Sequence, residues 1–99
     1  MINPKEQTAL VTGASGGIGK EIARFLAMKG YNLILVARSK DKLQELQKAW
    51  KDEFQIHINI FPTDLANKKQ LAQLFDRVKF EQLKVDILIN NAGFGDYGE

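Results

Sequence analysis

Hydrophobic residues occur along this chain in two patterns, short continuous runs and a helical spacing of three or four. Continuous runs of this length are typical of parallel strands that are covered on both faces. The runs predict four strands, at Thr8–Thr12, Tyr31–Ala37, Gln55–Phe61 and Val85–Ile89. The third alternates polar and apolar residues, which favours an edge strand, and Pro62 ends it.

Between the strands, the helical spacing predicts three helices. The first is expected to run from Gly17 to near Gly30. The second is expected to follow a cap at Ser39 and end near Lys51, and the third to follow Asp64 and end near Gln82. Their buried faces are expected to contain Ile18, Ile22, Phe25 and Leu26; Leu43, Leu46 and Trp50; and Leu71, Leu74, Phe75 and Val78. Strands that alternate with helices indicate an α/β fold, a doubly wound parallel sheet with strand order 3-2-1-4.

Composition narrows the class of protein. The 99 residues are 44% hydrophobic and 26% charged, which predicts one soluble domain spanning residues 1–99. The net charge of +2 is spread along the chain, so no nucleic-acid partner is expected. The absence of cysteine excludes disulfides and fits a cytoplasmic location. No apolar run reaches the ~20 residues that span a membrane, and the single histidine, His57, is expected at the surface rather than on a metal.

A glycine-rich turn joins the first strand to the first helix. Gly13 allows a sharp turn, Gly17 allows backbone to approach a phosphate, and Gly19 allows close packing of the helix. The unpaired N–H groups at the start of the helix favour an anion there. The expected phosphate-binding residues are Gly13, Ser15, Gly16, Gly17, Ile18 and Gly19. The alternative is a glycine-rich turn that binds nothing.

The pattern T-G-x-x-x-G-x-G at Thr12–Gly19, together with N-N-A-G at Asn90–Gly93, resembles the short-chain dehydrogenase/reductase family. The resemblance extends over essentially all 99 residues, which correspond to the N-terminal, cofactor-binding part of the family's Rossmann-like fold. It implies an oxidoreductase that transfers hydride between a nicotinamide dinucleotide and a small carbonyl or alcohol substrate. It also places Asn91, Ala92 and Gly93 beside the cofactor, where the small residues let the dinucleotide pass close to backbone. A plain Asn/Gly turn is the alternative.

The end of the second strand bears on the choice of cofactor. An Asp or Glu there would bind the ribose hydroxyls of NAD, but the sequence has Ala37 followed by Arg38. A guanidinium can hold a 2′-phosphate through charge-assisted hydrogen bonds that raise affinity roughly ten- to a hundredfold. The family's NADP pattern maps onto Arg38, so NADP is expected over NAD. Some NADP-preferring members also carry a basic residue where this chain has Gly16. A solvated arginine at a strand end is the alternative.

After the third strand, the resemblance implies that Asp64 and Leu65 contact the adenine of the cofactor. Asp64 could also cap the third helix, because short acceptors are favoured at that position. The two roles are compatible.

The family's catalytic residues have no counterpart here. Members pair a tyrosine with a lysine four residues later, whereas Tyr31 is followed by Leu35 and Tyr97 lies near the end of the sequence. The chain is therefore expected to be an inactive fragment whose uncovered strand Val85–Ile89 favours self-association. Two other functions stay open: a stand-alone dinucleotide-binding sensor or interaction module, and a structural fragment in which the glycine turn is vestigial.

Overall fold

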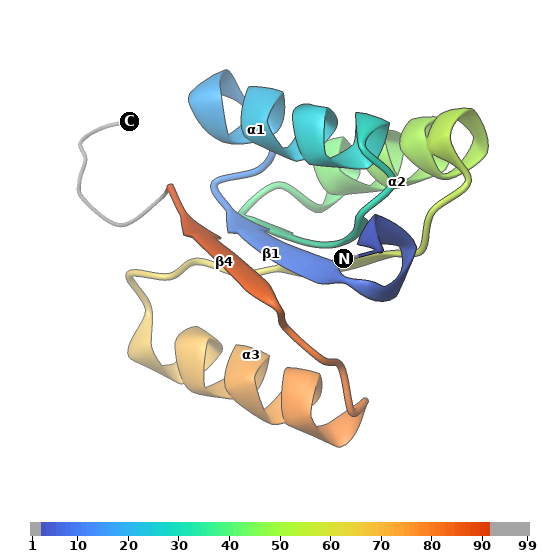
Figure 1. The fold of residues 1–99 in the computed structure, drawn as a ribbon. Coiled ribbons are helices and arrows are strands. Elements are labelled where there is room, and N and C mark those ends of the chain that lie inside the picture. The colour runs from blue at the N-terminus through green and yellow to red at the C-terminus, as the bar shows by residue number, and fades with distance from the viewer. Residues whose placement is uncertain (1–2, 92–99) are drawn as a thin grey trace.

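The computed structural model describes residues 3–91, which form a four-stranded sheet between two layers of helices (Figure 1). The strands are β1 (Thr8–Thr12), β2 (Asn32–Ala37), β3 (Ile58–Pro62) and β4 (Ile87–Asn90). The helices are α1 (Gly17–Met28), α2 (Lys40–Phe54) and α3 (Lys68–Phe80), and a 3₁₀ turn at Pro4–Glu6 precedes β1. Strands and helices alternate as the hydrophobic pattern predicts.

The sheet is parallel and has the order β3-β2-β1-β4, so the predicted Rossmann-like order 3-2-1-4 is confirmed. In register, Leu10 of β1 lies opposite Ile34 of β2 on one side and Leu88 of β4 on the other. The chain builds outward from β1 in one direction and then returns to its other side. A sheet that reverses in this way binds ligands beyond the carboxyl ends of its strands, at the reversal.

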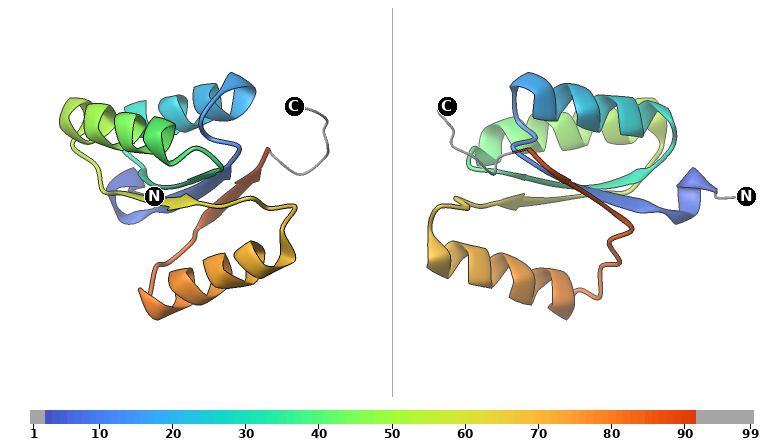
Figure 2. Two further views of the ribbon diagram at one scale, coloured as in Figure 1. Left: turned by 180° about the vertical axis from the view of Figure 1, so that it is seen from behind. Right: turned by 60° about the vertical axis from the view of Figure 1, so that its left-hand side comes forward.

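Helices cover both faces of the sheet, α1 and α2 on one and α3 on the other (Figure 2). Along β1, Ala9 and Val11 pack into the cluster that contains α1 and α2, whereas Leu10 packs into the cluster with Leu74 of α3. Both central strands are therefore buried on both faces, which explains their continuous apolar sequence.

The buried face of α1 differs from the predicted one. The residues it buries are small, Gly19, Ala23 and Ala27, which follow one another at intervals of four. Ile18 and Phe25, predicted to be buried, are 71% and 56% exposed. Small residues let the helix backbone lie close to the sheet, and the larger apolar side chains are displaced to its flanks. The apolar periodicity could not show this, because alanine and glycine contribute little to it.

The faces of α2 and α3 agree better with the sequence. Ser39 caps α2 by accepting a hydrogen bond from Lys42 N–H, and Leu43 and Trp50 are buried as predicted. On α3, Leu74 is buried, but Phe75 is 65% exposed and the prediction for it is wrong. Phe75 directly follows Leu74 on the helix and is turned away from the sheet.

Two strand boundaries also differ from the prediction. Gln55, expected to open the third strand, has φ +54° and ends α2 in the left-handed conformation, so β3 begins only at Ile58. The fourth strand begins at Ile87 rather than Val85. Asp86, inside the stretch predicted as strand, binds the backbone at the start of β1 instead.

Candidate functional site

Hydrogen bonds join the carboxyl ends of the strands into one edge. Ala14 N–H, in the glycine turn, donates to Val36 O of β2 at 3.1 Å, and Thr63 N–H, after β3, donates to Ala37 O at 2.7 Å. On the other side, Asn91 N–H donates to Thr12 Oγ1 at 2.9 Å. The turns that contain the predicted site residues therefore leave the sheet side by side, from neighbouring strands.

The glycine turn leads directly into an uncapped helix. Gly13 and Gly17 have positive φ of +64° and +57°, which L side chains rarely adopt. Gly16 stands at the N-cap of α1, and no side chain of the described residues caps this helix. In contrast, Ser39 caps α2 and Asn67 caps α3. The N–H groups of the first turn of α1 are thus left to solvent or to an anion.

Gly19 sits where α1 approaches the turn most closely. A Cβ added to it would overlap the carbonyl oxygen of Gly13 and lie 2.7 Å from Asn91 Nδ2. The contact that requires glycine here is with the turn and with Asn91, more than with the strands of the sheet. Gly19 therefore brings the glycine turn and the end of β4 together.

Arg38 follows β2 at the same edge, and its side chain has no partner among the described residues. The other arginines are engaged: Arg24 lies near Glu53 and Phe54, and Arg77 binds Glu81. Arg38 is exposed and forms no hydrogen bond or ion pair with any residue in the range 3–91. Its guanidinium is available to an anion near the glycine turn.

The turn after β3 shows how Asp64 is used. Asp64 Oδ1 accepts a hydrogen bond from Ala66 N–H at 3.0 Å, and Asn67 rather than Asp64 caps α3. The alternative role of Asp64 as the cap is therefore wrong, because a tight turn puts the start of the helix three residues further on. Leu65 follows with its side chain packed against the core beneath α3.

The N-N-A-G segment is described only in part, since Ala92 and Gly93 lie outside the described residues. Thr12 Oγ1 lies 3.2 Å from Asn90 Oδ1 and 3.4 Å from Ile89 O, and accepts from Asn91 N–H. Sequence reasoning gave Thr12 no role beyond its place in the motif. A hydroxyl that ends a strand opposite an asparagine was the available signal.

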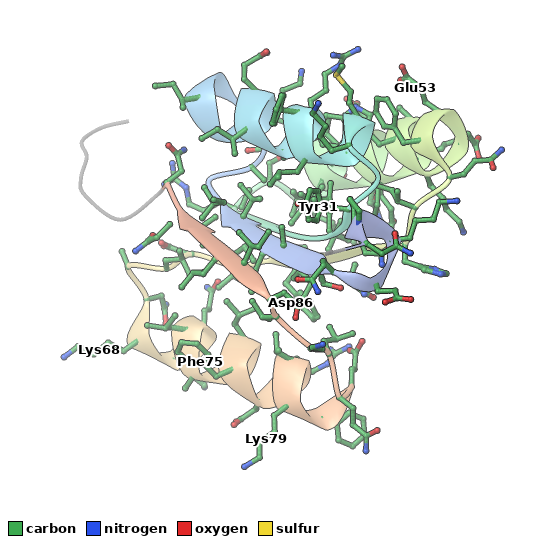
Figure 3. All side chains as sticks on the ribbon, in the orientation of Figure 1. Tyr31, Glu53, Lys68, Phe75, Lys79 and Asp86 are labelled. Carbon is green, nitrogen blue, oxygen red and sulfur yellow. The ribbon has the colours of Figure 1, made fainter. Side chains whose placement is uncertain are left out.

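At the opposite, amino edge, Asp86 is a second residue that sequence reasoning missed (Figure 3). Its Oδ2 accepts from Thr8 N–H at 2.8 Å, and its own N–H donates to Thr8 O at 2.8 Å. The hydrogen bond from Thr8 holds the pKa of Asp86 below its ordinary value; Lys84, whose Nζ lies 3.3 Å from Oδ1, adds to this, and desolvation opposes it. Asp86 thus fixes the start of β4 against β1.

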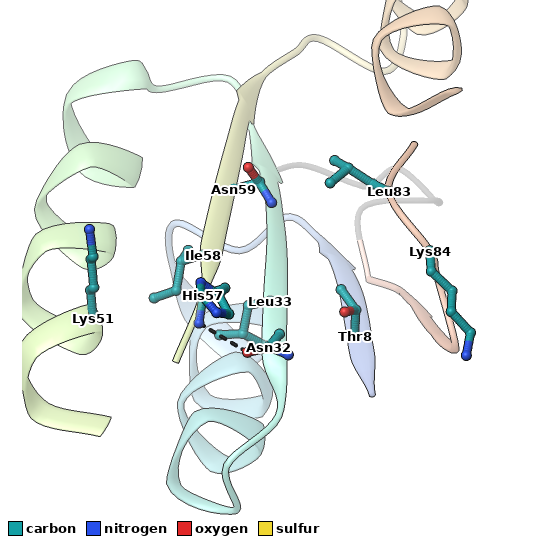
Figure 4. Close-up of a pocket in the computed structure, with 9 residues that line it drawn as sticks. All are labelled: Thr8, Asn32, Leu33, Lys51, His57, Ile58, Asn59, Leu83 and Lys84. Atoms are coloured by element: carbon teal, nitrogen blue, oxygen red, sulfur yellow. Dashed lines mark hydrogen bonds between the residues drawn. The ribbon is translucent and has the colours of Figure 1, made fainter. Parts of the chain in front are cut away.

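A pocket also lies at the amino edge, where β1 and β2 begin at Thr8 and Asn32 (Figure 4). His57 is exposed, as predicted, and its backbone N–H donates to Asn32 Oδ1 at 3.0 Å. This pocket is at the other end of the strands from the predicted site residues. No metal-binding group of His, Cys, Asp or Glu occurs within residues 3–91.

The strand order and the position of the glycine turn define a Rossmann-like α/β protein. The model of the short chain dehydrogenase family matches residues 7–99 of the sequence. The chain belongs to this family, and the resemblance seen in its motifs is confirmed. Within the described residues, no helix is long and apolar enough to cross a membrane.

Relatives and solved structures agree with this assignment. The chain is 44% identical over 85 residues to a very-long-chain 3-oxoacyl-CoA reductase of Kluyveromyces lactis, matching 86% of this chain and 25% of that protein. A bulky-bulky ketone specific alcohol dehydrogenase from Comamonas testosteroni superposes with TM-score 0.82 at 40% identity, over 95% of this chain and 37% of the other. L-Sorbose reductase from Gluconobacter frateurii, complexed with NADPH and L-sorbose, superposes with TM-score 0.81 at 33% identity, over 94% and 35%.

The chain therefore spans between a quarter and two fifths of the length of these proteins. The part that it spans contains the glycine turn and a parallel sheet of four described strands.

Proposed function

We propose that this chain is the NADP(H)-binding part of a short-chain dehydrogenase/reductase. The whole protein would transfer hydride between NADP(H) and a small carbonyl or alcohol substrate. The nicotinamide supplies the hydride chemistry, and the residues described here bind and orient the dinucleotide. The 99-residue chain alone is expected to be inactive, because it contains no tyrosine followed by a lysine four residues later.

Arg38 is the observation that supports the choice of NADP. Its guanidinium is exposed and unpaired within residues 3–91, at the end of the strand whose Val36 O binds the glycine turn. A 2′-phosphate on a ribose at this edge would come within reach of this positive charge. No carboxylate occupies the preceding position, Ala37, to repel it. The NADPH complex of the related L-sorbose reductase is consistent with this proposal.

The remaining residues at the edge fit the rest of a dinucleotide. The uncapped first turn of α1 offers N–H groups to the pyrophosphate. Ile18 presents an exposed apolar side chain beside it. Asp64 and Leu65 are proposed to contact the adenine. The other proposed contacts are Gly13, Ser15, Gly16, Gly17, Gly19, Asn91, Ala92 and Gly93.

The test is a titration of the chain with NADPH and with NADH, followed by heat or cofactor fluorescence. Wild type is expected to bind NADPH roughly ten- to a hundredfold more tightly, and Arg38→Ala is expected to lower NADPH affinity to the NADH level. Arg24→Ala is the matched control, since Arg24 is an exposed arginine of α1 that pairs with Glu53.

Equal affinity for the two cofactors in wild type would remove the NADP assignment and leave the dinucleotide site. Binding of neither cofactor would remove the proposed function of the chain and favour a vestigial glycine turn.

We also propose that the 99-residue chain self-associates through β4. β3 and β4 are the edge strands of the described sheet, and on β4 the large apolar side chain of Leu88 is 64% exposed. Light scattering after size-exclusion chromatography is expected to show a mass that rises with concentration and falls to the monomer in Leu88→Lys. Met28→Lys, at an exposed position of α1, is the control. A monomer at every concentration would contradict this proposal.

Two further expectations stay predictions. Residues 1–99 are proposed to form a single NAD(P)-binding domain, and the cysteine-free composition predicts a cytoplasmic location.

A further inference from the structure

The turn between β3 and α3 is held by a side chain of the helix that follows it. Asp64 N–H donates to Gln70 Oε1 at 2.8 Å. Gln70 is in the first turn of α3, where its own N–H donates to the Asn67 cap at 3.1 Å. A glutamine at this position of a helix often binds back to the N-cap residue itself. Here the Gln70 side chain instead binds Asp64, three residues before the cap and shortly after the end of β3.

The other hydrogen bonds of this turn, within residues 3–91, do not involve Asp64 N–H. Thr63 is buried, its N–H donates to Ala37 O and its Oγ1 donates to Phe61 O at 3.1 Å. Asp64 O accepts from Asn67 N–H at 3.0 Å, and Asp64 Oδ1 accepts from Ala66 N–H. These bonds fix the two sides of the turn, while Gln70 fixes the Asp64 peptide between them.

Two polar atoms on consecutive residues remain without partners in residues 3–91. They are Asp64 Oδ2, an acceptor, and Leu65 N–H, a donor. The edge of an adenine presents the complementary pair, an amino donor beside a ring-nitrogen acceptor. Two hydrogen bonds to one rigid ring require a fixed geometry of the backbone between the two protein groups.

We infer that Gln70 is a positioning residue for adenine recognition. By accepting from Asp64 N–H it fixes the backbone on the amino side of Asp64, the residue that bears the carboxylate and is followed by the Leu65 N–H group. It touches neither adenine nor phosphate. This inference rests on the proposed binding of a dinucleotide at the carboxyl edge.

The experiment compares NADPH with its analogue that carries hypoxanthine in place of adenine, each titrated into the 99-residue chain. Hypoxanthine replaces the amino donor by a carbonyl and the ring acceptor by an N–H, so both proposed contacts are lost. Wild type is expected to prefer NADPH by about tenfold or more. Gln70→Leu, similar in size but without an acceptor, is expected to bring the ratio close to one. Gln70→Glu retains an acceptor and is expected to restore most of the preference.

Gln73→Leu is the matched control, because Gln73 is an exposed glutamine of α3 whose side chain forms no hydrogen bond with a described residue. Amide hydrogen exchange at Asp64 supplies a readout in the free protein: exchange is expected to be faster in Gln70→Leu and unchanged in Gln73→Leu.

The outcomes separate the inference from the proposed function. If wild type prefers NADPH and Gln70→Leu keeps the same ratio, the inference is wrong and the dinucleotide site stands. If Gln70→Leu lowers the affinity for NADPH and for the hypoxanthine analogue by the same factor, the inference is also wrong. That result would show that Gln70 supports the structure of the turn without determining adenine recognition. If wild type binds neither ligand, both are overturned.

Discussion

The two edges of the sheet use their polar groups in opposite ways. At the amino edge, Asp86 exchanges two hydrogen bonds with Thr8, and the side chain of Asn32 donates to Lys5 O and accepts from His57 N–H. At the carboxyl edge, the Arg38 guanidinium and Leu65 N–H have no partner in the described part of the chain. Among residues 3–91, the side-chain hydrogen bonds that join neighbouring strands at this edge are those of Thr12, to Ile89 O, Asn90 Oδ1 and Asn91 N–H.

The difference separates what holds the strands together from what a ligand can use. Polar groups at the amino edge determine how the strands begin and are satisfied within the protein. At the carboxyl edge the Arg38 guanidinium is exposed and Leu65 is half-buried, so water can satisfy these two groups in the free protein at little cost in stability. Within residues 3–91, the unpaired groups that a ligand could use at the ends of the strands are therefore those of the carboxyl edge, whereas Asp86 and Asn32 at the amino edge already bind within the protein.

The largest effect is expected at Gly19. In Gly19→Ala, the new Cβ would overlap the Gly13 carbonyl oxygen, so α1 or the turn must move. Overpacking of this kind costs about 1–3 kcal/mol. We expect the free energy of unfolding to fall by that amount and dinucleotide affinity to fall more than tenfold, measured by denaturant titration and calorimetry.

Gly16→Ala is the matched control for Gly19→Ala. Gly16 has an extended backbone, with φ −169°, and a Cβ there would meet nothing within 4 Å. Each variant adds one methyl group, Gly16→Ala at the N-cap of α1 and Gly19→Ala within its first turn. Equal losses in both would show that the close approach at Gly19 does not determine the site.

A second prediction concerns the closed amino edge and its dependence on pH. Because folding lowers the pKa of Asp86, its contribution to stability is complete above the unfolded pKa of about 4 and is lost as the pH falls through the folded pKa. Asp86→Asn removes this contribution. The stability difference between wild type and Asp86→Asn is therefore expected to be largest near neutral pH and to shrink below about pH 4.

Urea unfolding at a series of pH values measures this difference. Asp76→Asn is the control, because Asp76 is an exposed carboxylate of α3 with no ion pair to a described residue. A difference between wild type and Asp86→Asn that stays constant with pH would contradict a role for the charge. Dinucleotide affinity at neutral pH is expected to be unchanged in folded Asp86→Asn, which would keep the two edges distinct.

The smallest effect is expected from a second cation at the open edge. Gly16 has room for a side chain and an ordinary backbone conformation, so Gly16→Arg is expected to fold normally. An exposed ion pair contributes up to about 1 kcal/mol, so the preference for NADPH over NADH should rise by up to about fivefold at low salt. The measurement is the ratio of the two affinities at two salt concentrations. A ratio of NADPH to NADH affinity that is lower in Gly16→Arg than in wild type would place the 2′-phosphate away from Gly16.

Much of the fold could be predicted because continuous and periodic apolar segments report directly on burial. The strand order and the buried Leu43 and Trp50 of α2 followed from this. The buried face of α1 did not, because contact through Gly19, Ala23 and Ala27 depends on backbone distance rather than on hydrophobicity. The start of β3 was placed too early because the left-handed conformation of Gln55 has no glycine or asparagine to indicate it.

The sequence predicted which turns form the candidate site, but not the hydrogen bonds between distant residues that hold the strand ends together. Motif positions placed Gly13, Arg38 and Asp64 at strand ends, and the structure places those ends at one edge. The hydrogen bonds made by Thr12 and Asp86 join residues 77 to 79 positions apart. Such pairs have no local sequence pattern, so only the folded chain shows them.

The row of small residues on α1 also limits how sequences of this kind can diverge. Because a helix rises 1.5 Å per residue, Ala27 lies about 12 Å along the axis of α1 from Gly19. Both residues are on the buried face of α1 and allow the helix to pack closely. A larger side chain at Ala27 would push α1 away from the sheet and displace the glycine turn at its start. Phe25 and Met28 are exposed, so larger or smaller side chains fit there. The proposed phosphate site would therefore depend on residues along the whole of α1, including ones that the phosphate would not touch.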